Sequence, residues 1–174
     1  MTPPAFRAVL PCLVLAGCSP ALDWREVRPP GSGAVLLFPC RPAAQERRLP
    51  LAGQPVQLQL LACSAGGQTW GLAQADLQDP ARLGAALAQL RAAAAANIGA
   101  TVPGGVLPLQ VPGATPHEGS ARVRLAGRLP DGAAAHMQLA VFTHGTQVFQ
   151  ATALGEALSE EAAEVFFTSI RFPP

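Results

Sequence analysis

The 174-residue chain contains no lysine and no tyrosine. Its twelve basic residues are therefore all arginines, and they balance eleven acidic residues to give a formal net charge of +1. This balance argues against a nucleic-acid-binding protein, which needs a concentrated basic surface. The absence of tyrosine removes one common general acid from any active site. Outside the N-terminal region no apolar run approaches eighteen residues, so no transmembrane helix is predicted.

Motifs that carry out catalysis or hold a cofactor are also missing. The sequence has no phosphate-binding loop and no dinucleotide fingerprint, and neither Gly31-Ser32-Gly33 nor Gly119-Ser120 fits a nucleophile elbow. His117-Glu118 lacks the second histidine of a zinc-protease helix. His136 and His144 are predicted on one strand face but roughly 26 Å apart, too far to bind one metal ion. We therefore predict no catalytic residues, no metal and no cofactor.

The N-terminal residues form a short apolar segment that ends in a cysteine. One charge, at Arg7, precedes an apolar run over 8–16 that is too short to cross a hydrocarbon core of ~30 Å. The residues Leu15-Ala16-Gly17-Cys18 resemble the lipobox of bacterial lipoproteins. The resemblance implies a signal peptide over 1–17 and a diacylglyceride on the Cys18 sulfur. The alternative is an ordinary secretory signal that leaves Cys18 as an oxidisable thiol.

The residue after Cys18, Ser19, indicates in which membrane the protein is anchored. Among the lipoproteins that this segment resembles, aspartate at that position favours retention in the inner membrane. Ser19 therefore implies an outer-membrane lipoprotein that faces the periplasm. Two or three acyl chains anchor a protein stably, so the lipid on Cys18 is expected to be the membrane anchor.

Two cysteines remain once Cys12 leaves with the signal peptide and Cys18 carries the lipid. In an oxidising compartment Cys40 and Cys63 form an even pair, which predicts a disulfide bond. The bond would close a 24-residue loop, worth ~3.5 kcal/mol in the chain-entropy model. A redox or metal site is the alternative, but neither cysteine has a C-x-x-C partner or a nearby histidine.

Hydrophobic periodicity and turn residues predict the elements of the mature chain. Residues 18–33 are expected to form the lipidated N-terminus and a tether with a short strand, whose Trp24 either docks on the domain or lies at the membrane interface. Residues 34–174 are expected to form one domain. Asp79-Pro80 and Ser159 predict the starts of two helices, the first ending near Asn97. Strands are predicted at 34–38, 56–60, 69–75, 106–111, 122–129, 136–142 and 147–154.

Short turns between alternating strands predict the fold class. It is α+β, with a mostly antiparallel sheet of about six strands and two helices packed against it. In the hairpin that spans 122–142, matching the inward faces requires a three-residue loop with Gly132 in the left-handed conformation. This register places Arg124 opposite Gln138 and Ala126 opposite His136.

Three segments of the mature chain carry a second resemblance. They are Phe38-Pro39-Cys40-Arg41-Pro42, Gly113-Ala114-Thr115-Pro116 and Phe166-Phe167-Thr168-Ser169-Ile170-Arg171-Phe172. Together with the central helix they resemble small domains of the PsbP and Mog1 type. The resemblance implies a binding or assembly module without a shared catalytic apparatus, a transfer that rests on fold analogy.

One predicted surface suggests a binding role. Arg122, Arg124 and Arg128 alternate along the outward face of one strand, with His136 and Gln138 on its neighbour. Guanidinium groups can hold carboxylates or phosphates through paired hydrogen bonds, so this face is a candidate site for an anionic envelope component or a partner protein. The alternative is a polar sheet face that arginine keeps soluble.

These observations predict a non-catalytic, periplasm-facing envelope lipoprotein that binds a protein or another envelope component. The alternative is a small-ligand carrier or weak enzyme with a pocket between the sheet and the helices. Polar groups converging on a pocket would favour the carrier, whereas a filled core with an exposed apolar or arginine patch would favour the binding module.

Overall fold

The computed structural model describes residues 22–100 and 105–174, so the signal segment over 1–17 and Cys18 lie outside it. The strands are β1 (Arg25–Val27), β2 (Leu36–Phe38), β3 (Ala43–Leu51), β4 (Gln54–Ala65), β5 (Gln68–Asp76), β6 (Gly105–Leu107), β7 (Ala121–Arg128), β8 (Ala134–His144) and β9 (Gln147–Gly155). The helices are α1 (Leu83–Asn97), preceded by a 3-10 turn at Pro80–Arg82, and α2 (Glu160–Thr168).

Seven strands form one antiparallel sheet in the order β3-β4-β5-β9-β8-β7-β6, and β1 pairs with β2 in a small second sheet. The predicted α+β class with a mostly antiparallel sheet and two helices is therefore confirmed. The main sheet has seven strands where about six were predicted.

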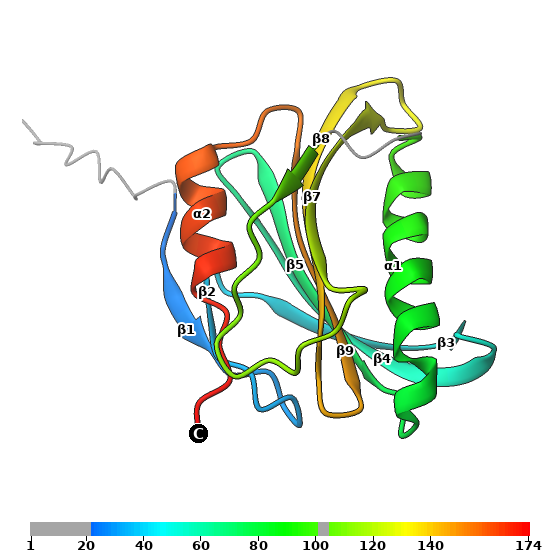
Figure 1. Cartoon of the computed structure of the whole chain (residues 1–174). Helices are drawn as coiled ribbons and strands as arrows, with labels where there is room; N and C mark the ends of the chain where they lie inside the picture. Colours follow the sequence, from blue (N-terminus) through cyan, green and yellow to red (C-terminus); the bar gives the residue numbers. More distant parts are fainter. Residues whose placement is uncertain (1–21, 101–104) are drawn as a thin grey trace, which may run out of the picture.

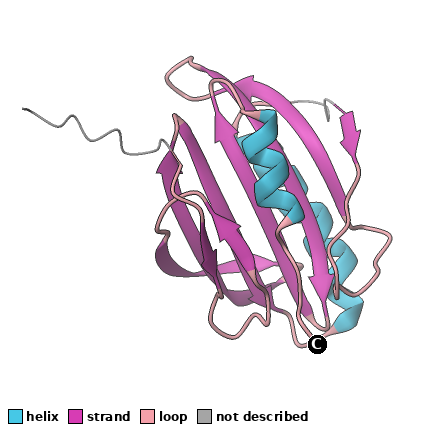
Figure 2. Cartoon of the chain, turned by 90° about the vertical axis from the view of Figure 1, so that its left-hand side faces the viewer, coloured by secondary structure: helices cyan, strands magenta, loops and turns pink. Residues whose placement is uncertain are grey.

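The main sheet is covered on both faces, with α2 on one side and α1 on the other (Figure 1; Figure 2). Successive residues of a strand point to opposite faces. On β8, Leu139 and Val141 belong to the apolar cluster under α1, whereas Ala140 and Phe142 belong to the cluster under α2. The strands in the middle of the sheet are therefore buried on both sides.

Local sequence signals correctly placed the helix starts and the β7–β8 turn. The Asp79 side chain accepts a hydrogen bond from the backbone N–H of Ala81, and Ser159 caps α2 in the same way. Gly132 has φ +87°, the left-handed conformation that the three-residue loop requires. The register pairs Arg124 with Gln138 and Ala126 with His136, as predicted.

The strand β3 was missed because its sequence has no apolar alternation. Its residues 43–48 are all exposed, including Arg47 and Arg48. The strand pairs only with β4 at the edge of the sheet, and only its last residues, Leu49 and Leu51, join an apolar cluster. At the opposite edge, β6 is shorter than the strand predicted at 106–111.

The segment from Leu22 to Gly33 is folded against the domain. Strand β1 pairs with β2, and the Asp23 backbone N–H donates to the Pro39 carbonyl oxygen at 2.8 Å. Trp24 packs edge-on against Trp70, with ring centres 6.1 Å apart. Trp24 therefore docks on the domain, which was the first of the two predicted placements.

Candidate functional site: a glutamine-lined cleft

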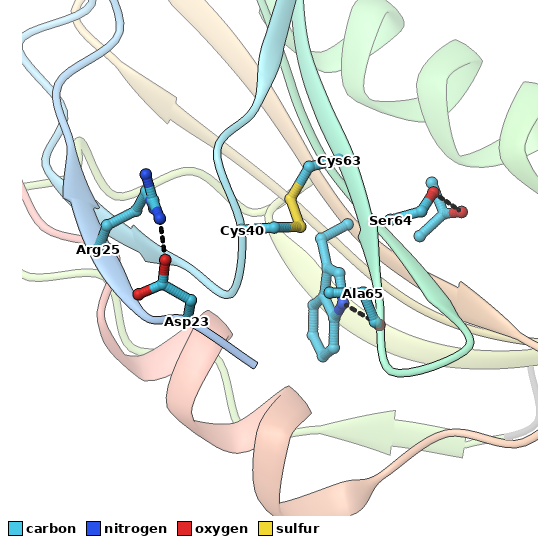
Figure 3. The surroundings of a disulfide bond; sticks show 8 residues. Asp23, Arg25, Cys40, Cys63, Ser64 and Ala65 are labelled. Atoms are coloured by element: carbon cyan, nitrogen blue, oxygen red, sulfur yellow. Dashed lines mark hydrogen bonds and ion pairs between the residues drawn. A yellow bond between two sulfur atoms is a disulfide. The ribbon is translucent and has the colours of Figure 1, made fainter. Parts of the chain in front are cut away.

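Cys40 and Cys63 are joined by a disulfide bond (Figure 3), which confirms that prediction. The bond connects the segment after β2 to β4 and therefore fixes the small sheet to the main one. Because both sulfurs are used in the bond, neither is available in this state as a metal ligand or a redox nucleophile.

Part of the predicted arginine face is covered by α2. Arg122 is only 4% exposed. Its guanidinium group lies 3.0 Å from the Glu164 carboxylate, donates to Gln138 Oε1 at 2.8 Å, and sits 4.3 Å from the centre of the Phe167 ring. The expectation that Arg122 faces solvent is therefore wrong, since its side chain holds α2 on the sheet.

Arg124 is also paired within the chain. Its guanidinium group donates to Glu160 Oε2 at 2.6 Å, and Gln138 Nε2 donates to the same oxygen at 3.1 Å. The hydrogen bond from Arg124 lowers the pKa of the Glu160 carboxyl group below its ordinary value. Arg122 and Arg124 therefore both hold carboxylates, and those carboxylates belong to α2.

Apart from the buried Arg122, the side chains of the predicted site lie in two separate places. Arg124, His136 and Gln138 line a groove of about 370 Å³ beside the loop that precedes α2. Arg128 lies apart, where it donates to the Gly132 carbonyl oxygen in the hairpin turn. Glu156 also lines the groove, and Arg124 is already neutralised by Glu160. The charges of this groove therefore do not favour an anionic ligand.

Replacing Arg122 with alanine is expected to lower the free energy of unfolding by about 2–3 kcal/mol, because it leaves the buried Gln138 oxygen without its donor and removes the contact with Phe167. Arg48→Ala on the exposed strand β3 is the matched control, with an expected change within about 0.5 kcal/mol. Urea denaturation measures both. Equal losses in the two variants would show that Arg122 does not hold α2 in place.

A second concavity, the glutamine cleft, lies at the opposite end of the sheet. The groove described above lies beside Gly155, which pairs with Gln68 at the start of β5. The cleft lies beside Gln147, which pairs with Asp76 at the end of β5. The cleft has a volume of about 470 Å³. Six of the twelve glutamines of the chain line it: Gln54, Gln57, Gln59, Gln74, Gln78 and Gln147.

Two of these glutamines are oriented by the loop between β1 and β2. Gln74 Nε2 donates to the Pro30 carbonyl oxygen at 2.9 Å, and Gln147 Nε2 donates to the Gly31 carbonyl oxygen at 2.8 Å. A carbonyl oxygen can only accept, so these bonds fix which end of each amide carries the nitrogen. The Oε1 atoms of Gln74 and Gln147 are buried and have no hydrogen-bond partner among the described residues.

Four of the six cleft glutamines donate their amide N–H groups to the protein itself. Gln74 Nε2 also donates to Gln59 Oε1 at 2.7 Å. The side chains of Gln57 and Gln59 in turn donate to the Glu46 carboxylate on β3. This network therefore uses amide donors and leaves the two amide oxygens of Gln74 and Gln147 unpaired. An unpaired buried acceptor costs about 1–3 kcal/mol.

The charged groups that line the cleft are engaged with the backbone and with a hydroxyl group. Arg82 donates to three backbone carbonyl oxygens, those of Leu51, Ala52 and Leu77. Asp76 accepts from the Gln78 backbone N–H and from the Thr146 hydroxyl. The chemistry of the cleft is therefore dominated by amide groups, and it suits an uncharged polar ligand.

Sequence reasoning did not identify the glutamine cleft. One signal was present, because Gln57 and Gln59 occupy the outward positions of the alternating segment 56–60, where charged residues are common. Gln74 and Gln147 give no such signal. They come together only because β5 pairs with β9, with Gln74 opposite Phe149 and Asp76 opposite Gln147.

Within residues 22–100 and 105–174, no group of three histidine, cysteine or acidic side chains could hold a metal ion. No helix in that part of the chain is long and apolar enough to cross a membrane. No protein family and no curated protein matches the sequence. The function is therefore inferred from the residues and their geometry.

Proposed function

We propose that this chain is a lipid-anchored, non-catalytic binding protein of the bacterial cell envelope. Cys18 carries the lipid, and Ser19 directs the protein to the periplasmic face of the outer membrane. The glutamine cleft is its binding site, and the ligand is an uncharged group of an envelope protein or another envelope component. The resemblance to binding and assembly domains of the PsbP and Mog1 type supports the same class of function.

The observation that carries the proposal is the pair of amides held by one loop. Gln74 and Gln147 come from different strands, yet the neighbouring carbonyl oxygens of Pro30 and Gly31 orient both. The loop is itself fixed, since the buried Ser32 hydroxyl donates to the Pro29 carbonyl oxygen and accepts from the Ala34 backbone N–H. A recognition site depends on groups that are positioned before the ligand arrives.

A small-ligand carrier is the second candidate function. The volume of the cleft, about 470 Å³, falls in the range of small-molecule sites. In the described residues, however, the space between the sheet and each helix is filled by one of the two apolar clusters. A carrier would therefore have to use the glutamine cleft at the end of the sheet, and not a pocket between the layers.

Affinity capture of the full-length protein from cross-linked envelopes tests the proposal. We expect one stoichiometric partner, with recovery reduced roughly tenfold or more when Gln57→Ala and Gln147→Ala are combined. Gln110→Ala, at an exposed position outside the cleft, is the matched control and should retain the partner. Cys18→Ala should lose it through mislocalisation.

Unchanged recovery with the cleft variant would contradict the proposed site. If the native protein captures no partner, a thermal-shift screen of small uncharged compounds distinguishes the carrier. A stabilising compound whose effect disappears in the Gln57→Ala, Gln147→Ala variant would favour the carrier over the binding module.

A further inference from the structure

The first described residues, from Leu22 onward, pack against the domain. Leu22 packs over Gly66 in the β4–β5 turn, such that a Cβ atom on that glycine would lie 3.1 Å from Leu22 Cδ2. The next two residues are also fixed, Asp23 by its hydrogen bond to Pro39 and Trp24 by its contact with Trp70. From Leu22 onward the backbone therefore belongs to the domain.

Only three residues separate Leu22 from the proposed lipid anchor at Cys18. Whatever its conformation, a chain of this length spans at most ~14 Å between the two Cα atoms. The strand β5, by comparison, extends for ~26 Å from Gln68 to Asp76. If Cys18 is at the membrane surface, Leu22 lies within ~14 Å of it, and the end of the sheet that contacts Leu22 is therefore close to the lipid headgroups.

The residues around Leu22 form a continuous surface, here called the anchor-end surface. It consists of the β4–β5 turn at Gly66 and Gly67 together with the loop Glu156, Ala157 and Leu158. The two segments are adjacent because Gly155, which precedes Glu156, pairs with Gln68, which follows Gly67. The backbones also approach closely, since a Cβ atom added to Gly155 would lie 3.2 Å from the Gly67 carbonyl oxygen. Figure 1 shows β1 and α2 beginning at this same end of the molecule.

The chemistry of the anchor-end surface indicates the kind of lipid layer it fits. Its residues are small or apolar apart from Glu156, and the nearby Arg124 is already paired with Glu160. Attraction to anionic lipids requires a cluster of basic side chains. This surface suits the polar headgroups of zwitterionic lipids, and the short covalent connection, not charge, would hold it there.

The glutamine cleft lies at the far end of the same strands. It adjoins Asp76 and Gln147, whereas the anchor-end surface adjoins Gln68 and Gly155. We propose that the domain stands on the bilayer with its anchor-end surface against the headgroups and its glutamine cleft facing away, about 26 Å farther from the lipid. This inference rests on the proposed lipid anchor.

Fluorescence quenching in vesicles tests this orientation. The lipidated full-length protein is reconstituted in phosphatidylcholine vesicles that contain a headgroup-labelled nitroxide lipid, with a fluorophore on Ala157→Cys or on Ala81→Cys. Both positions are exposed alanines, one on the anchor-end surface and one beyond the Asp76 end of β5. We expect roughly threefold or more quenching at 157 relative to 81, because of their separation along the strands.

A third variant carries an insertion of about ten glycine and serine residues between Ala21 and Leu22, which adds a root-mean-square span of ~18 Å. The insertion should abolish the difference between the two labels. Equal quenching without the insertion, or a difference that survives it, would overturn the proposed orientation. Failure of the protein to float with the vesicles would instead overturn the proposed lipid anchor, so the two proposals fail in distinguishable ways.

Discussion

Replacing Trp70 with alanine is expected to lower the free energy of unfolding by about 4 kcal/mol. The side chain is completely buried, and its ring lies 5.3 Å from that of Phe166 and 6.1 Å from that of Trp24. It therefore joins three parts of the fold: the main sheet, α2 and the N-terminal segment. Truncation removes a large apolar surface and leaves a cavity between those layers.

Urea denaturation of the Trp70→Ala variant measures this loss. Trp24→Ala is the matched control, because the same side chain type is only partly buried there, and about half the loss is expected. A loss below about 1 kcal/mol for Trp70→Ala would show that the layers do not depend on this contact.

Removal of the disulfide bond is expected to cost about 3.5 kcal/mol, because the Cys40–Cys63 bond restricts the unfolded chain by closing a loop with a sequence separation of 23. The double variant Cys40→Ala, Cys63→Ala should show this loss in urea denaturation. The native protein should show a similar loss when a reducing agent is added, and the double variant should not respond to the reductant. A native protein whose stability is unaffected by reduction would contradict the bridge.

The parts of the fold that the sequence predicted correctly depend on local chemistry. Asp79 and Ser159 cap helices through hydrogen bonds that span only two or three residues. The β7–β8 register follows from one turn, because Gly132 supplies the left-handed conformation and the alternating apolar residues determine which faces match. Such signals act over a few residues, so one segment of sequence contains them completely.

The arginine face was misjudged because alternation shows which residues share a face but not what covers it. Arg122 and Arg124 have the polar pattern of a solvated strand, yet α2 lies on them. A signal was present in the spacing. Glu160 and Glu164 are four helical residues apart, a rise of ~6 Å, which nearly matches the ~7 Å between alternate residues on a strand.

The glutamine cleft could not be predicted for a related reason. Gln74 and Gln147 are 73 positions apart in the sequence and meet through the pairing of β5 with β9, which no local pattern specifies. The carbonyl oxygens of Pro30 and Gly31 orient the two amides only in the folded chain. Tertiary contacts therefore make this loop part of the site.

Mass spectrometry of the N-terminal peptide tests the lipid anchor, on which the proposed function and orientation depend. The protein is extracted from membranes with detergent and cleaved by trypsin after Arg25, the first arginine that follows Cys18. The lipoprotein proposal predicts a peptide that begins at Cys18 and carries a diacylglyceryl group on its sulfur. A peptide that begins elsewhere, or an unmodified Cys18 thiol, would contradict it.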